Sequence, residues 1–221
     1  MRRIGMAMLS LAFATAPLFG QRSALREVHD GGNRGSFGVN VVVAEPLGAF
    51  RTNSDVAGGL QVFGVTSGGP LALRIDGSWI AYDATYQGYG VSTLSQIASL
   101  GAGPQLTIGQ GPLRFYGFAT IGGSMFWSSA SYGCGCSGYS AFLNGHVTTT
   151  TTAGGGLLLG LTRGRTPIAL DLGARAVRHD RVRYVPAGGL TQNSDGSFTA
   201  TEVESRVDMR VYQIGVSIGI R

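Results

Sequence analysis

The chain of 221 residues contains no lysine, and its seventeen basic residues are all arginine. Only 13% of its residues are charged, against roughly 25% in an average soluble domain. The net charge of +5 is small, and the arginines alternate with acidic or apolar residues instead of gathering on one face, which argues against nucleic acid as a partner. No run of 18 apolar residues follows the first 20 residues, which argues against a transmembrane helix there.

Glycine and apolar residues are abundant instead. There are 37 glycines, and 43% of the residues are hydrophobic. A chain this apolar, without helices that could cross a bilayer, is accounted for by a closed β-barrel, because a barrel also satisfies every backbone polar group in lipid.

The first twenty residues read as an export signal. Arg2 and Arg3 precede an apolar stretch at 4–19, which is too short to span a bilayer comfortably. We therefore expect a signal peptide at 1–20, an N-terminal periplasmic segment at 21–35 and a barrel domain at 36–221. An N-terminal membrane anchor is the alternative.

Apolar and small polar residues alternate along the barrel domain, which predicts strands. Near the C-terminus, for example, Ile214, Val216 and Ile218 share one face, whereas the intervening glycine and serine residues share the other. The expected strands cover 36–44, 56–66, 70–82, 96–108, 112–127, 150–162, 166–178 and 206–220.

The connections between these strands alternate in length. Glycine-bearing turns at 67–69, 109–111 and 163–165 are short, and long polar loops occupy 45–55, 83–95, 128–149 and 179–205. Short periplasmic turns and longer external loops are typical of outer-membrane barrels. The sequence therefore predicts an all-β fold, an eight-stranded antiparallel up-and-down transmembrane β-barrel. A soluble lipocalin-like binder, with its apolar face turned inward around a ligand, is the most different alternative.

Aromatic residues end two of the outgoing strands. Such residues form girdles at the membrane interfaces of barrels. We therefore expect an outer-interface girdle made of Trp79, Tyr82, Phe126 and Trp127.

The segments Leu100 to Leu106, Gly117 to Gly123 and Ile214 to Gly219 resemble the small outer-membrane β-barrel family related to the OmpA transmembrane domain and OmpX. The resemblance covers about 36–221. It implies an eight-stranded barrel with a packed, polar, mostly non-conducting interior and no catalytic motif. It therefore implies a structural or surface-interaction role through the external loops, and no cofactor.

Charged residues occur on the face expected to line the barrel. Charges away from bulk water must be paired or hydrated, and eight strands leave an interior that side chains just fill. We predict an ion-pair network that plugs the lumen, with a gate for a narrow pore as the alternative. The expected luminal polar residues are Arg74, Asp76, Asp171, Arg175, Gln105 and Gln213.

Two cysteines, Cys134 and Cys136, lie in a long external loop. In an exported protein a pair of cysteines predicts a disulfide. Free thiols or an intermolecular bond are one alternative, and a metal site with His146 is another, although no metal ligand set is complete.

Arginines gather in the long loops and beside them. Because guanidinium groups suit phosphate, we expect an external rim that binds anionic glycolipid such as lipopolysaccharide, with a solvated loop as the alternative. The rim candidates are Arg51, Arg178, Arg181, Arg183 and Arg206.

A lipid A-modifying acyl hydrolase would need a serine, a histidine and an acid on one face. His146, His179, Glu202 and Glu204 could supply parts of such a site, but no fixed spacing supports it. We therefore expect no enzyme activity. The expected protein is a monomer in the bacterial cell outer membrane, inserted by the barrel-assembly machinery, with outer-membrane lipids as neighbours.

Overall fold

The computed structural model describes residues 35–52, 54–66, 70–82, 85–87, 91–109, 111–132, 139–162, 166–186, 189–193 and 198–220. The predicted signal peptide at 1–20 and nearly all of the segment at 21–35 lie outside the described residues. No helix in the described part has the length and hydropathy needed to cross a membrane.

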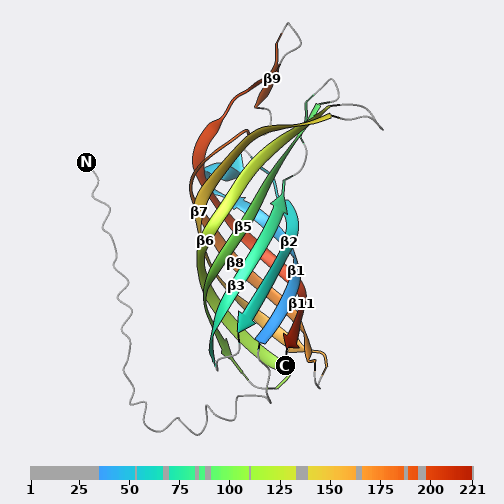
Figure 1. The fold of residues 1–221 in the computed structure, drawn as a ribbon, viewed down its shortest axis with the longest axis vertical. Helices are drawn as coiled ribbons and strands as arrows, with labels where there is room; N and C mark the ends of the chain where they lie inside the picture. Colours follow the sequence, from blue (N-terminus) through green and yellow to red (C-terminus); the bar gives the residue numbers. More distant parts are fainter. Residues whose placement is uncertain are drawn as a thin grey trace, which may run out of the picture.

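Eight long antiparallel strands close into a barrel (Figure 1). Each strand pairs with its neighbour along the chain, and the first strand pairs with the last, so that Gly35 lies opposite Ile220 and Leu47 opposite Asp208. Every barrel strand therefore has two partners and the sheet has no open edge along the barrel, as predicted. The barrel strands are β1 (Gly35–Leu47), β2 (Ala57–Thr66), β3 (Leu71–Ala81), β5 (Val91–Ile108), β6 (Leu113–Tyr132), β7 (Tyr139–Gly160), β8 (Ile168–Tyr184) and β11 (Val203–Ile220).

The side chains alternate between an apolar outer face and a buried inner face. Ile214, Ile218 and Leu73 are 53%, 36% and 49% exposed on the outside. Gln213 and Arg74, next to them in the chain, are buried inside. A lipocalin-like arrangement requires the opposite orientation, so the structure contradicts that alternative.

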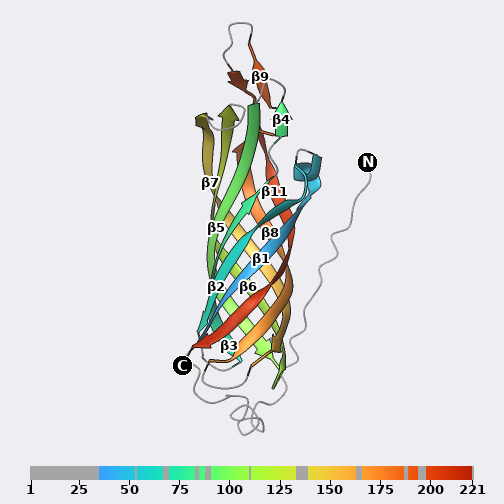
Figure 2. The same cartoon turned by 90° about the vertical axis from the view of Figure 1, so that its right-hand side faces the viewer.

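Several strands continue beyond the ends that the alternation predicts (Figure 2). β5 begins at Val91, β6 ends at Tyr132 and β7 begins at Tyr139, where the sequence analysis placed long loops. Serine and threonine are common on these extensions, so the apolar alternation ends before the strands do.

Four short elements decorate the same end of the barrel. They are the 3₁₀ helix η1 (Gly48–Thr52) and the strands β4 (Thr85–Gln87), β9 (Leu190–Gln192) and β10 (Phe198–Ala200). Strands β9 and β10 pair with each other above the barrel, and β4 pairs with β5. At the opposite end, Gly109 and Gly111 have φ angles of 110° and 71°, which suit glycine in the tight turn that the sequence predicts there.

Candidate functional site: the luminal network and the outer rim

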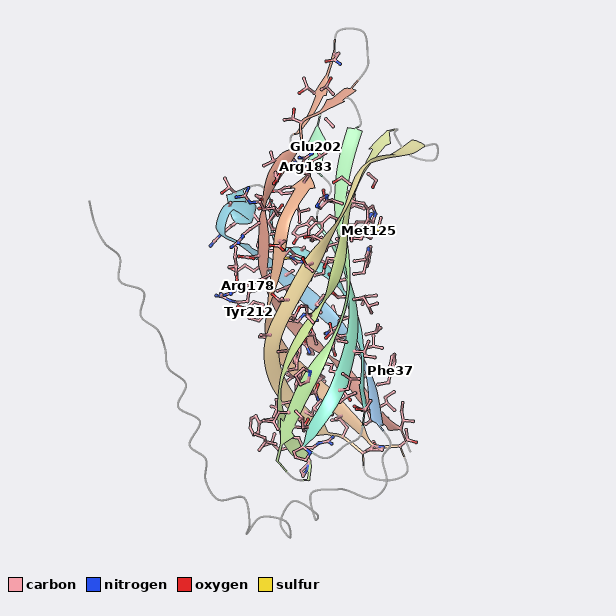
Figure 3. All side chains as sticks on the ribbon, turned by 60° about the vertical axis from the view of Figure 1, so that its left-hand side comes forward. Phe37, Met125, Arg178, Arg183, Glu202 and Tyr212 are labelled. Carbon is pink, nitrogen blue, oxygen red and sulfur yellow. The ribbon has the colours of Figure 1, made fainter. Side chains whose placement is uncertain are left out.

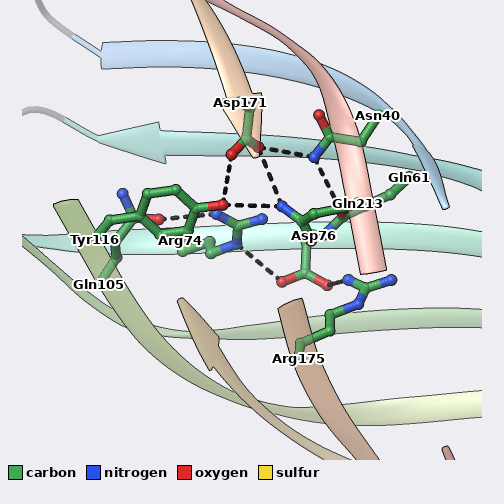
Figure 4. A network of polar contacts seen from close by, with 9 residues as sticks. All are labelled: Asn40, Gln61, Arg74, Asp76, Gln105, Tyr116, Asp171, Arg175 and Gln213. Atoms are coloured by element: carbon green, nitrogen blue, oxygen red, sulfur yellow. Dashed lines mark hydrogen bonds and ion pairs between the residues drawn. The ribbon is translucent and has the colours of Figure 1, made fainter. Parts of the chain in front are cut away.

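A network of polar side chains crosses the interior of the barrel (Figure 4). Its members come from every barrel strand except β7, so the closure of the sheet is what brings them together. The six luminal residues expected from the sequence all belong to it. This luminal network consists of Asn40, Gln61, Arg74, Asp76, Gln105, Tyr116, Asp171, Arg175 and Gln213.

One half of the luminal network is centred on Asp76. Arg74 Nε donates to Asp76 Oδ2 at 3.1 Å, and Arg175 Nη1 lies 3.6 Å from Asp76 Oδ1. Arg74 Nη1 also donates to Gln105 Oε1 at 2.9 Å. Asp76 thus joins two buried guanidinium groups, which otherwise would repel each other across a region with little water.

The other half is centred on Asp171, which is held by neutral donors. The Tyr116 hydroxyl donates to Asp171 Oδ1 at 2.6 Å, whereas Asn40 Nδ2 and Gln213 Nε2 donate to Oδ2 at 2.9 and 3.1 Å. These three donors are uncharged, whereas Arg175, two inward positions along β8, pairs with the other carboxylate, Asp76.

Aromatic rings enclose the Arg74 guanidinium group. Its Cζ atom lies 4.2 Å from the ring centroids of both Phe63 and Phe118. Both rings are buried, so the cation–π attraction acts where water does not compete strongly.

Sequence reasoning missed five of these side chains, namely Asn40, Gln61, Phe63, Tyr116 and Phe118. A signal for two of them was present. Asn40 lies between Val39 and Val41, and Gln61 between Leu60 and Val62, so each is a polar position on the inward side of an alternating strand.

Strand β7 has glycine where it faces the luminal network, so it leaves room for the side chains of neighbouring strands. A Cβ atom on Gly156 would lie 2.6 Å from the Tyr116 hydroxyl oxygen, and one on Gly154 would lie 2.5 Å from Arg175 Cβ. Glycine at both positions therefore allows the two largest neighbouring side chains to lie flat against the wall.

The loop end of the interior is apolar, which differs from the uniformly polar lumen expected. Phe50, from η1, turns into the barrel and contacts Tyr82 and Tyr184 edge to face, with ring centroids 5.2 and 5.4 Å apart. We call the buried residues around it the mouth cluster. They are Val42, Ala44, Phe50, Ala57, Ile80, Tyr82, Ile97, Phe126, Val177, Val182, Tyr184, Val207, Met209 and Val211.

The mouth cluster corrects the expected girdle. Tyr82 and Phe126 are buried inside the barrel, not placed at the outer interface. Trp79 is exposed on the outer face, and Trp127 is half-buried. The reason is the strand period of two residues: Phe126 and Trp127 are adjacent and must face opposite sides.

Between the luminal network and the mouth cluster, one wall of the interior carries hydroxyl groups. Ser124 bonds to Ser99 at 2.6 Å and also to Thr150. Ser95 and Ser128, nearer the mouth, bond at 3.0 Å. These contacts satisfy polar groups of β5, β6 and β7 that would otherwise be buried without partners.

The rim arginines fall into three places. Arg181 and Arg183 share Glu204, at 3.9 and 3.3 Å. Arg51 is exposed on η1. The other two, Arg178 and Arg206, line one depression on the outside of the barrel wall, and Figure 3 shows Arg178 projecting from that wall.

Two of the candidate hydrolase residues, His179 and Glu204, lie on opposite faces of the barrel wall. His179 is buried inside the barrel, where its Nδ1 lies 2.6 Å from the Val207 carbonyl oxygen. Glu204 is on the outside and accepts from Arg183 Nε. No group of three potential metal ligands occurs among the described residues, and Cys134 and Cys136 lie outside them.

No protein-family model matches the chain. No curated protein matches it either. Among solved structures, the chain is similar to Neisserial surface protein A, with a TM-score of 0.46, 14% identity and coverage of 86% of this chain and 99% of that one. It is also similar to the attachment invasion locus protein Ail of Yersinia pestis in complex with the heparin analogue sucrose octasulfate, with a TM-score of 0.46, 12% identity and coverage of 85% and 99%. A major outer membrane protein from Thermus thermophilus gives a TM-score of 0.47, 12% identity and coverage of 84% and 99%.

Proposed function

We propose that this protein is an outer-membrane β-barrel with a closed lumen and a structural or surface-interaction role at its loop end. The observation that carries the proposal is the apolar outer face. Large apolar side chains are exposed on seven of the eight barrel strands, from Val41 on β1 to Ile214 on β11, and on β8 the apolar residues Ile168, Leu170 and Leu172 are partly exposed. A soluble monomer rarely exposes so extensive an apolar surface, whereas lipid covers it at no cost in hydration.

The height of this surface fits a bilayer. On β3 the exposed apolar positions run from Leu71 to Trp79, and on β11 they run from Tyr212 to Ile220. A tilted transmembrane strand needs about 9–11 residues. Beyond that band β11 places Arg210, Asp208 and Arg206 outward, which suits the headgroup region.

Membrane insertion is tested on the full-length chain produced with its export signal. We expect it in the outer-membrane fraction, and we expect its band on a gel to shift between unheated and boiled samples, as folded barrels do. Recovery in the soluble periplasmic fraction, with no such shift, would contradict the proposal.

The interior supports a closed lumen. The luminal network and the mouth cluster fill successive levels of the bore, and a small internal cavity of about 10 Å³ lies between them, lined by Asp76, Arg175 and Met209 among others. That volume is about one water molecule. In planar bilayers we therefore expect no stable single-channel current from the purified protein, and a steady open state would support the narrow-pore alternative.

The loop end supports a surface-interaction role. β7 pairs with β6 from Tyr139 onward but with β8 only from Thr150 onward. In the described part of the chain, 139–149 therefore form one edge of a projecting sheet, and such edges can pair with another chain. We propose that the protein is a monomer, inserted by the barrel-assembly machinery, whose projecting strands and the 180–205 connection meet partners outside the cell.

A further inference from the structure

The outer wall of the barrel carries a groove where large side chains are missing. Ala119, Ala153 and Ala176 lie directly opposite one another on β6, β7 and β8, and all three face outward. With Ala102, Pro104 and Ile121 they line a groove of about 550 Å³, which we call the wall groove. Elsewhere the outer face carries leucine, isoleucine, valine and phenylalanine.

A polar depression joins the wall groove at its loop-side end. This rim depression, of about 300 Å³, is lined by Arg178, His179, Arg206, Asp180, Asp208 and two threonines. Arg178 and Thr151, which lie opposite each other on β8 and β7, line both hollows. The surface is therefore continuous and amphipathic, apolar toward the middle of the barrel and polar toward the loops.

The arginines of the rim depression differ from Arg181, Arg183 and Arg210 in their ion pairing. Arg181 and Arg183 lie within 4 Å of Glu204, and Arg210 lies 3.6 Å from Glu45. Among the described residues, no ion pair includes Arg178 or Arg206. Asp180 accepts instead from the Thr149 hydroxyl at 3.2 Å. Guanidinium groups bind phosphate with two parallel hydrogen bonds, and the headgroup level, where these two arginines lie, is where lipid phosphates are found.

We propose that the two hollows form one binding site for a phosphorylated glycolipid of the outer leaflet. One acyl chain lies in the wall groove over Ala119, Ala153 and Ala176, and a phosphate group contacts Arg178 and Arg206. This inference rests on the proposed outer-membrane location, because it needs lipid against the barrel wall. The barrel architecture alone requires neither a particular lipid-binding face nor a phosphate group in the bound lipid. The proposed site specifies both.

The test uses the full-length chain extracted in detergent, with native mass spectrometry to measure binding of bis-phosphorylated lipid A. Arg178→Gln removes the phosphate contact, and the double substitution Ala119→Leu with Ala153→Leu fills the groove. Arg210→Gln is the matched control, since Arg210 lies on the same rim but lines neither hollow. We expect roughly tenfold weaker binding for Arg178→Gln, because a hydrogen bond to a charged group is lost. The filled groove should weaken binding similarly, and the control should bind within about twofold of the unaltered protein.

Several results would overturn the site. One is equal binding of lipid A by Arg178→Gln and the Arg210→Gln control. Another is equal binding of lipid A and its dephosphorylated form. A third is displacement of lipid A by millimolar inorganic phosphate alone. A dimer of the unaltered protein that the filled-groove variant converts to a monomer would assign the face to a second copy instead. The heat-dependent gel shift, measured on each variant, separates these results from failure to insert. If the double variant does not fold, Ala176→Leu alone fills part of the groove.

Discussion

Asp76 on β3 and Arg175 on β8 form an ion pair across the full diameter of the barrel, with 3.6 Å between Oδ1 and Nη1. In the closed order of eight strands, β3 and β8 are four strands apart in either direction. The pair therefore ties opposite walls together, and Arg74 joins it from the Asp76 side.

Loss of Arg175 should destabilise the barrel. Arg175→Ala leaves Asp76 with Arg74 as its ion-pair partner and opens space beside the small internal cavity. Breaking a buried pair costs about 3–5 kcal/mol, which urea unfolding in lipid vesicles would measure. Arg210→Ala, which breaks the exposed pair with Glu45, should cost less than about 1 kcal/mol. An equal, small effect of both substitutions would remove the structural role of the luminal pair.

The effects of Asp76→Asn and Arg175→Met should not add. Asp76→Asn removes the carboxylate from both Arg74 and Arg175, and Arg175→Met then relieves only one of these two buried charges. A double-mutant cycle gives the coupling between the two positions. Additive effects of the two single substitutions would mean that the 3.6 Å contact contributes nothing.

Glycine at position 156 should be essential for the Asp171 half of the luminal network. A methyl group from Gly156→Ala would clash with the Leu172 carbonyl oxygen and with the Tyr116 hydroxyl, so both the β8 backbone and the 2.6 Å bond from Tyr116 to Asp171 would be displaced. Such overpacking costs about 1–3 kcal/mol. The control is Gly117→Ala, next to Tyr116 in the chain, where the nearest atom to the new methyl group lies 3.9 Å away. Thermal unfolding should separate the two variants, and similar midpoints would contradict the packing described.

Phe50 should hold η1 in the barrel mouth. Phe50→Ala removes a buried ring from between Tyr82 and Tyr184, and changes of this kind cost about 3–5 kcal/mol. Arg51→Ala changes the exposed neighbour and should have little effect. Protease digestion of intact cells would show the consequence: we expect faster cleavage within 48–52 in Phe50→Ala only. Cleavage at an unchanged rate would mean that the ring does not anchor the loop.

The alternation of side chains was sufficient to predict the eight barrel strands, and it predicted the inner and outer faces of β3, β5, β8 and β11; on β6 the adjacent large residues Phe115 and Tyr116 left the faces undecided. The alternation placed Arg74 and Asp76 inside because Leu73 and Ile75 are apolar neighbours on a strand. It could have placed Tyr82 correctly as well, since Trp79 faces outward and the two positions differ by an odd number of residues. The sequence analysis assigned aromatic residues to the girdle because they are aromatic. Whether such a residue faces lipid or the lumen depends instead on whether its position is odd or even along the strand.

Partner choice inside the barrel could not be predicted from the sequence. Whether Asp171 meets Tyr116 depends on the register between β6, β7 and β8, and a one-residue shift would turn Tyr116 outward. The position of Phe50 could not be predicted either, because this loop residue enters the barrel mouth through contacts with side chains of strands distant in the sequence. The wall groove needs two registers at once, since Ala119, Ala153 and Ala176 lie on three strands and are far apart in the chain.

Tryptophan fluorescence in bilayers tests the orientation of the barrel wall most directly. In a chain whose Trp79 and Trp127 are replaced by phenylalanine, Ile214→Trp introduces one reporter on the outer face and Phe118→Trp introduces one on the inner face. We predict that lipids brominated along their acyl chains quench the Ile214→Trp variant strongly and the Phe118→Trp variant weakly. Quenching of the Ile214→Trp variant by aqueous acrylamide, with strong bromolipid quenching of the Phe118→Trp variant, would show that the apolar face does not meet lipid.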